Sequence, residues 1–283
     1  MTRINRHWRP VLVITVLLAV IIVAAAFSPL LFAHQGRDNG STSVKPPSPA
    51  IVTIPANKNL FEPFILPIKP GTTVIWQNND TQAHPFTTTP DHNTFLNRQA
   101  FSFNLAAGKS ARYIFTQPGL YHYFETRLDS WDSTVSRVRA GMKKINFPLA
   151  MDGIIWVQGS IANLPSTTLN FMPDGHDEFA YEFLAITRDG AITWHNLDAD
   201  AHFVGEVSGW ASPVNPADMG LYRIAGTSEV PGGDFATIFF QTPGLYYYYC
   251  RNHDYVDPLD NRAYPLAMTS EFPIPMEGFV LVV

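Results

Sequence analysis

The strongest constraint on the fold of this chain is an internal repeat. Residues 115–157 align without a gap on residues 240–282 at a constant offset of 125 positions. Earlier in the chain, residues 74–84 match residues 192–202 at an offset of 118. Two halves that share motifs in the same order predict two homologous domains, and 283 residues accommodate two domains of about 100 residues each.

Both halves have the composition of β-strands. Runs rich in Val, Ile, Thr, Tyr and Phe are separated by turns containing Pro, Gly, Asn and Asp. No long amphipathic helix stands out in the body of the chain, which predicts an all-β protein. Strands are expected at 73–76, 111–115, 154–157, 236–240 and 278–283.

The second half carries four residues whose side chains suit one copper ion. Cys250 is the only cysteine in the chain, and His253 follows it after two residues. His202 lies upstream and Met276 downstream. A thiolate, two imidazoles and a weak thioether ligand form the trigonal site used for blue-copper electron transfer. We therefore predict that these four residues bind one copper ion that cycles between Cu(I) and Cu(II).

A second methionine, Met268, competes with Met276 for the axial position. The repeat favours Met276, because residues 147–153, which contain Met151, fall on residues 272–278. A lone cysteine is more often a small buried apolar residue, so the prediction depends on the complete order His, Cys, His, Met.

This pattern resembles the cupredoxin family. The resemblance includes the four candidate ligands, the PGLY sequence at 243–246 before the cysteine strand, and Trp194 and Asn196 before the first histidine. It implies two tandem Greek-key β-sandwiches with a type 1 copper site in the second. One departure is the loop between His253 and Met276, which is longer than in the simplest members of the family.

The first half lacks the ligands of a blue-copper site. Glu125 and Leu128 stand at the positions of the cysteine and of the second histidine, whereas His84 and Met151 are retained. We therefore expect the first domain to be a degenerate structural domain.

A carboxylate and one imidazole leave open a harder ion such as Zn²⁺ in the first half, if another group joins them. His92 or His122 could supply that group. His122 alternates with Tyr121 and Tyr123, so its side chain should point to the opposite face of the strand.

The N-terminal segment differs from the rest of the chain. Three arginines precede an uncharged, mostly apolar run at 10–33. About 20 apolar residues span a bilayer, and the basic flank predicts a cytoplasmic N-terminus with the remainder exported to the periplasmic or extracellular side. A cleaved signal peptide is the alternative. The predicted organisation is a flank at 1–9, an anchor at 10–33, a flexible linker at 34–50, and domains at 51–160 and 161–283.

The formal net charge of −5 argues against a broad basic face that would bind nucleic acid. The two domains nevertheless differ in charge within one loop. A solvated loop is the default interpretation of each; alternatively, opposite charges steer redox partners, or the loop of one domain packs on its neighbour. The basic loop carries Arg137, Arg139, Lys143 and Lys144, and its counterpart carries Asp254, Asp257 and Asp260.

Three functions are compatible with these ligands. We expect an electron carrier that exchanges electrons with unidentified donor and acceptor proteins, and homo-oligomerisation is left open. Copper delivery or storage is the second hypothesis. Catalysis is third, because two-domain copper nitrite reductases and multicopper oxidases place a histidine beside the blue-site cysteine, whereas Tyr249 and Arg251 flank Cys250. The chain also has no His-x-His pair for a trinuclear cluster.

Overall fold

The computed structural model describes residues 46–141, 148–206, 221–222, 228–260, 262–266 and 274–283. All regular secondary structure within these ranges is β-strand, which confirms the predicted all-β class. No helix among the described residues is long and apolar enough to cross a membrane. The predicted anchor at 10–33, most of the linker at 34–50, Lys143, Lys144 and Met268 lie outside the described residues.

The first ten strands form two sheets that face each other across a buried core. One sheet has the order β1-β3-β6 and the other β2-β10-β7-β4-β5, while β8 and β9 form a separate hairpin. The core between the sheets is aromatic, with Trp76 lying 5.4 Å from Phe86 and 5.7 Å from Tyr123 between ring centroids. The strands are β1 Ala50–Ile54, β2 Ile65–Ile68, β3 Thr72–Asn78, β4 His84–Thr88, β5 Ser102–Leu105, β6 Ser110–Phe115, β7 Gly119–Glu125, β8 Asp129–Asp132, β9 Arg137–Ala140 and β10 Asp152–Val157.

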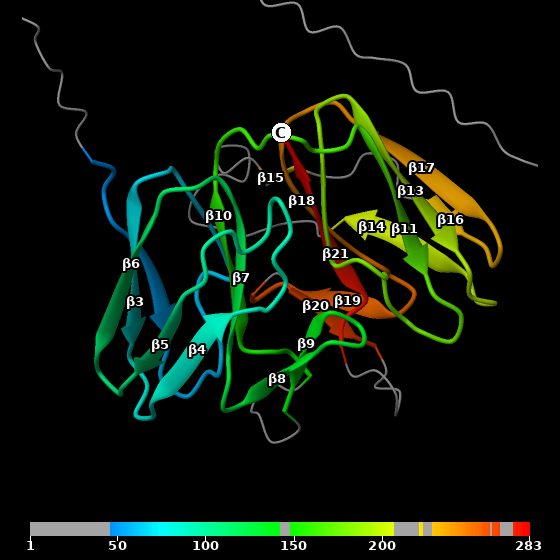
Figure 1. Ribbon diagram of the computed structural model, residues 1–283. Coiled ribbons are helices and arrows are strands. Elements are labelled where there is room, and N and C mark those ends of the chain that lie inside the picture. The colour runs from blue at the N-terminus through cyan, green and yellow to red at the C-terminus, as the bar shows by residue number, and fades with distance from the viewer. Residues whose placement is uncertain (1–45, 142–147, 207–220, 223–227, 261, 267–273) are drawn as a thin grey trace, which may run out of the picture. The chain divides into compact units, whose positions relative to one another are not determined.

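The remaining strands repeat this arrangement. The sheets have the orders β11-β13-β17 and β12-β21-β18-β14-β16, with β15 beside β18 and a hairpin of β19 and β20. Trp194 is fully buried in their core, as Trp76 is in the first. The strands are β11 Thr167–Met172, β12 Phe183–Ile186, β13 Gly190–Asn196, β14 His202–Glu206, β15 Leu221–Tyr222, β16 Ser228–Val230, β17 Phe235–Phe240, β18 Gly244–Tyr249, β19 Asp254–Asp257, β20 Arg262–Pro265 and β21 Glu277–Val282. We call the two sets of sheets the first and second sandwich (Figure 1).

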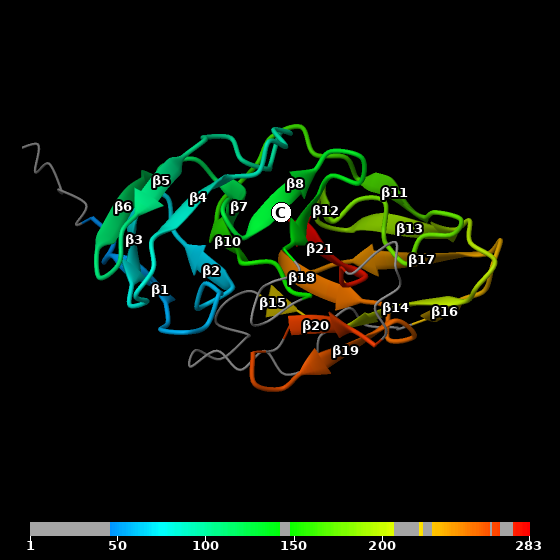
Figure 2. The same ribbon diagram turned by 90° about the horizontal axis from the view of Figure 1, so that it is seen from below.

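Alternation of side chains explains why the central strands of both sandwiches are buried on both faces. Tyr121 and Tyr123 of β7 lie in the core of the first sandwich. His122 between them faces the second sandwich, where its ring lies 5.0 Å from that of Phe183. The prediction that His122 points to the face opposite Tyr121 and Tyr123 is thus confirmed. β7 and β10 lie beside β18 and β21 in both views (Figure 2), and an apolar cluster shared by these strands joins the sandwiches.

Each sandwich has a glycine at the equivalent position of its last strand, and a tyrosine ring lies against that glycine. A Cβ atom added to Gly153 would lie 2.6 Å from the hydroxyl oxygen of Tyr123, and one added to Gly278 would lie 2.5 Å from that of Tyr248. Both distances are too short for any side chain, so each glycine permits the close packing of its strand on the tyrosine.

Two arginines related by the 125-residue offset cross between the sandwiches. Arg137 of β9 donates hydrogen bonds to the carbonyl oxygens of Phe179 and Glu277, at 2.7 and 3.2 Å. Arg262 of β20 donates in the opposite direction, to the carboxylate of Asp152 at 2.9 Å. Burial of two charged side chains is tolerated here because each is paired and hydrogen-bonded.

The expectation of a solvated basic loop is therefore wrong for Arg137, which is only 3% exposed. The interpretation in which the loop of one domain packs on its neighbour describes this residue. Arg139 is partly exposed and pairs with Asp132 at 2.5 Å. On the acidic counterpart, Asp254 is also buried, at 3% exposure. These two buried side chains cannot steer a partner through solvent.

Candidate metal centre

Three neighbouring strands bring the predicted ligands to one edge of a sheet. His202 is the first residue of β14, Cys250 directly follows β18, and Met276 directly precedes β21. Since β18 is antiparallel to both β14 and β21, its carboxyl end points in the direction of their amino ends. The backbone N–H of Cys250 donates to the carbonyl of Met276 at 2.9 Å, which fixes this junction.

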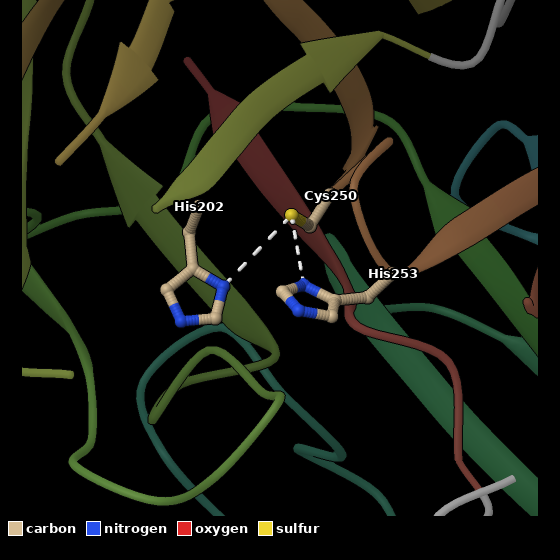
Figure 3. A group of neighbouring side chains, drawn as sticks. All are labelled: His202, Cys250 and His253. Atoms are coloured by element: carbon tan, nitrogen blue, oxygen red, sulfur yellow. Dashed lines mark hydrogen bonds between the residues drawn. The ribbon is translucent and has the colours of Figure 1, made fainter. Parts of the chain in front are cut away.

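The thiol and the two imidazoles converge on a common point (Figure 3). The Sγ atom of Cys250 lies 3.9 Å from Nδ1 of His202 and 3.3 Å from Nδ1 of His253. All three ligand atoms lie within 4.8 Å of one another. Metal–nitrogen and metal–sulfur bonds are about 2.0 and 2.3 Å long, so one ion could contact all three atoms. The donor set fits copper, which accepts both thiolate and imidazole ligands.

Cys250 is shielded from solvent. Its side chain is fully buried, and the backbone N–H of Phe203 donates to Sγ at 3.1 Å. Burial raises the pKa of the Cys250 thiol to about 11, although the Phe203 N–H opposes this effect. The thiol therefore holds its proton near neutral pH until a cation replaces it, and metal binding would release that proton.

An aspartate lies against each imidazole. Nε2–H of His202 donates to Asp198 at 3.0 Å, which leaves the Nδ1 lone pair directed toward Cys250. Burial acts to raise the pKa of Asp198, but hydrogen bonds from His202 and from backbone N–H groups outweigh it and lower the pKa. Nε2 of His253 lies 3.3 Å from the carboxylate of Asp177. Burial lowers the pKa of His253, which favours the neutral imidazole that a metal requires.

Met276, the predicted axial ligand, is buried in the same part of the second sandwich as Cys250. Its side chain is 1% exposed and belongs to the same buried cluster as Cys250. Its backbone N–H donates to Asp254 at 2.8 Å, and burial raises the pKa of that carboxyl group well above its usual range. The hairpin of β19 and β20, which begins at Asp254, thereby fixes the chain segment in which the methionine lies.

Sequence reasoning missed the roles of the three aspartates near the proposed ligands, and it named Asp254 only as part of an acidic loop. The repeat could have found two of them, because Asp198 precedes His202 as Asp80 precedes His84, and Asp254 falls 125 residues after Asp129. Asp177 lies in neither aligned segment, so no comparable signal pointed to it.

The equivalent position in the first sandwich holds His84 and Glu125, which lie at ion-pair distance from each other. Nε2 of His84 bonds Asp80 at 3.0 Å, and Nδ1 lies 3.6 Å from Oε1 of Glu125. Oε2 of Glu125 accepts hydrogen bonds from the backbone N–H groups of Arg127 and Leu128. This side-chain pair lies where the second sandwich has its first histidine and its cysteine.

Neither histidine proposed as a third ligand joins the His84 and Glu125 pair. Nδ1 of His92 bonds the carbonyl of Asn97 at 3.1 Å. His122 bonds Asp152 at 2.9 Å on the opposite face of its strand. Among the described residues, the groups of three or more metal-binding side chains all include His202 and none includes His84.

Comparison with known proteins gives limited matches. No protein-family model and no curated protein matches the chain. A purple cupredoxin from Nitrosopumilus maritimus is 20% identical over 41% of this chain and 99% of its own, with a TM-score of 0.27. An oxidised amicyanin variant is 16% identical over 43% of this chain and 87% of its own, with a TM-score of 0.26. A reduced amicyanin variant is 18% identical over 41% and 82%, also with a TM-score of 0.26.

Proposed function

We propose that this chain is a cupredoxin-type protein that carries single electrons through one type 1 copper ion bound by His202, Cys250, His253 and Met276. The observation that carries this proposal is the convergence of the buried Cys250 Sγ and two imidazole Nδ1 atoms at 3.3 and 3.9 Å. The copper would supply the one-electron Cu(I)/Cu(II) couple. The proposed domains are 51–160, without copper, and 161–283, with it.

The residues around the site favour electron transfer over copper exchange. The cysteine and His202 are fully buried, and both imidazoles are paired with carboxylates. Ligands fixed in this way need little rearrangement when the charge of the ion changes, which suits electron transfer. Rapid exchange of copper would instead require a thiol and imidazoles that reach solvent together.

We propose further that the chain is anchored in the cytoplasmic membrane through residues 10–33, with both domains on the periplasmic or extracellular side. The uncharged run and its basic flank support this proposal. Such an arrangement would present the copper domain to redox proteins at the membrane surface. Recovery of the chain in the membrane fraction after alkaline carbonate washing would support it, and release by the wash would contradict it.

The proposed function is tested by the visible spectrum of the full chain loaded with Cu(II) in detergent. We expect one copper per chain and an intense thiolate-to-copper band. Cys250→Ser should abolish that band, because a hydroxyl oxygen cannot provide the covalent overlap. The matched control is Glu125→Gln, which alters the equivalent position of the first sandwich and should leave the band unchanged. A colourless wild-type protein, or equal loss in both variants, would refute the proposal.

A further inference from the structure

Arg137 is anchored in the first sandwich by the hairpin that carries it. β9 pairs with β8, so that the backbone of Arg137 lies opposite Asp132. The next residue, Val138, packs in a small buried cluster with Phe124 and Ala150 of the first sandwich. The backbone of Arg137 is therefore held in the first sandwich, and only the side chain of Arg137 crosses to the second sandwich.

Among the residues that the structure describes, the hydrogen-bond and ion-pair partners of Arg137 across the interface lie in two short segments of the second sandwich. One is the connection between β11 and β12, where Arg137 bonds the carbonyl of Phe179 at 2.7 Å and its Nε lies 3.6 Å from the carboxylate of Glu178. Its Nη1 also lies 3.8 Å from the carboxylate of Glu182 at the end of that connection. The other segment is the start of β21, where Arg137 bonds the carbonyl of Glu277 at 3.2 Å.

Both segments adjoin proposed copper ligands. Asp177, whose carboxylate lies 3.3 Å from Nε2 of His253, directly precedes the residue with which Arg137 forms its closest ion pair. Glu277 directly follows Met276. The connection that carries Asp177 contains turns and bends but no strand. Side-chain contacts are therefore important for holding that carboxylate against the imidazole.

Arg262 provides a natural comparison within the same chain. It stands 125 residues after Arg137 and is equally buried, with its side chain 5% exposed against 4% for Arg137. Its guanidinium bonds the carbonyl of Ala150 and the carboxylate of Asp152, and it lies over the ring of Phe64 at 3.7 Å. These hydrogen bonds and the ring contact lie in the first sandwich, and none of them involves the connection between β11 and β12.

We propose that Arg137 is a positioning residue through which the first sandwich holds Asp177 on His253 and supports the segment of Met276. This inference rests on the proposed copper function and gives the first sandwich a specific role in it. A carboxylate close to Nε2 makes the imidazole a stronger donor, which favours Cu(II) over Cu(I). The geometry thus predicts that the first sandwich keeps the reduction potential of the copper lower than the second sandwich alone would.

The experiment compares Arg137→Gln with Arg262→Gln in the full copper-loaded chain. The measurements are the reduction potential, the rate of copper loss to a chelator and the Cu(II) electron paramagnetic resonance spectrum. We expect Arg137→Gln to raise the preference for Cu(I) about tenfold, which corresponds to an upward shift of ~59 mV for a one-electron couple. Arg262→Gln should disturb the interface to a similar extent and leave the potential near that of the wild type.

The sign of the shift separates positioning from a simple charge effect. Loss of a nearby positive charge by itself stabilises Cu(II) and lowers the potential, whereas release of Asp177 raises it. Asp177→Asn should produce the same upward shift, and the double variant should shift the potential no further, because both changes act through one contact. Arg137→Lys serves if the glutamine variant does not fold, since lysine keeps the charge and loses the planar fork.

The outcomes are distinct. An upward shift in Arg137→Gln or Arg137→Lys, absent in Arg262→Gln and not additive with Asp177→Asn, supports the inference. An unchanged or lowered potential, or an equal shift in Arg262→Gln, overturns it while leaving the copper function intact. A wild-type chain without the thiolate-to-copper band would refute the proposed function instead, before any variant is compared.

Discussion

The two sandwiches place different side chains in the same framework. In the second, His202 is held by an aspartate at 3.0 Å and faces Cys250. In the first, His84 is held by an aspartate at the same distance and faces Glu125. The aspartate that orients the imidazole is therefore present with or without the cysteine. The first sandwich lacks the proposed metal site because Glu125 and Leu128 stand at the positions of Cys250 and His253.

The same comparison extends to the faces that the sandwiches turn toward each other. His122 of β7 bonds Asp152 of β10, and at the equivalent positions Tyr247 of β18 donates its hydroxyl hydrogen to Glu277 of β21. The backbone pairing of the strands is the same in both. Equivalent positions thus keep a hydrogen bond but differ in charge. A substitution in one pair therefore tests the contribution of that sandwich alone.

The largest expected effect is the creation of a copper site in the first sandwich. Glu125→Cys with Leu128→His, made in the Cys250→Ser background, should bind one copper and show a thiolate-to-copper band. Met151 already has the same backbone support as its counterpart, because its N–H donates to Asp129 at 2.6 Å. Copper stoichiometry and the visible spectrum provide the measurement.

The control for this reconstruction is Glu125→Cys alone in the same background, which lacks the second imidazole and should give a weaker site. If the reconstructed chain binds no copper, then the similarity of the two frameworks does not extend to the ligand geometry.

A smaller effect should follow removal of the aspartate that orients each histidine. Asp198→Asn should weaken copper binding about 10- to 100-fold, because partners in the outer shell orient metal ligands and raise their basicity. Asp80→Asn, its match in the first sandwich, should leave copper binding unchanged and cost about 1–3 kcal/mol of stability through the lost charged hydrogen bond. Copper titration and urea unfolding of both variants separate the two effects. Equal losses of copper affinity would show that the first sandwich takes part in binding.

The sequence was most informative where local pattern and the repeat agreed. Runs rich in β-branched and aromatic residues predicted strands such as β3 and β17, and the order of His202, Cys250 and His253 predicted three side chains that the structure brings together. Both inferences depend on residue types in short stretches of the sequence. The domain boundaries and the role of Met276 as a ligand stay predictions.

The contacts between the sandwiches were beyond the sequence pattern. Arg137 belongs to a charged stretch, and such a stretch is usually solvated. Its burial depends on carboxylates and carbonyl groups more than 40 residues away, as with Phe179. Asp177 was missed for a related reason, because its role depends on a connection without regular structure. Long-range packing of this kind leaves no periodic signal in the chain.

The smallest expected effect concerns the pH dependence of stability through His122 and Asp152. Burial acts to lower the pKa of His122, but the hydrogen bond to Asp152 and the charge of Glu182 raise it above its ordinary value. Burial acts to raise the pKa of Asp152, while Arg262 and His122 lower it to about 2. The stabilisation from His122 is therefore complete below about pH 6.5 and is lost as the pH rises through its folded pKa.

His122→Gln should remove this dependence. The free energy of unfolding in urea, measured for the metal-free chain from pH 5 to 9, should be higher for the wild type below pH 6.5 by about 1.5–3 kcal/mol, the usual contribution of a hydrogen bond to a charged group. The difference should shrink at higher pH, because deprotonation of His122 then removes its ion pair with Asp152 from the wild type as well. His92→Gln is the control, since that imidazole bonds a backbone carbonyl. A difference that grows with pH would mean that His122 is neutral in the folded chain, and that burial outweighs Asp152.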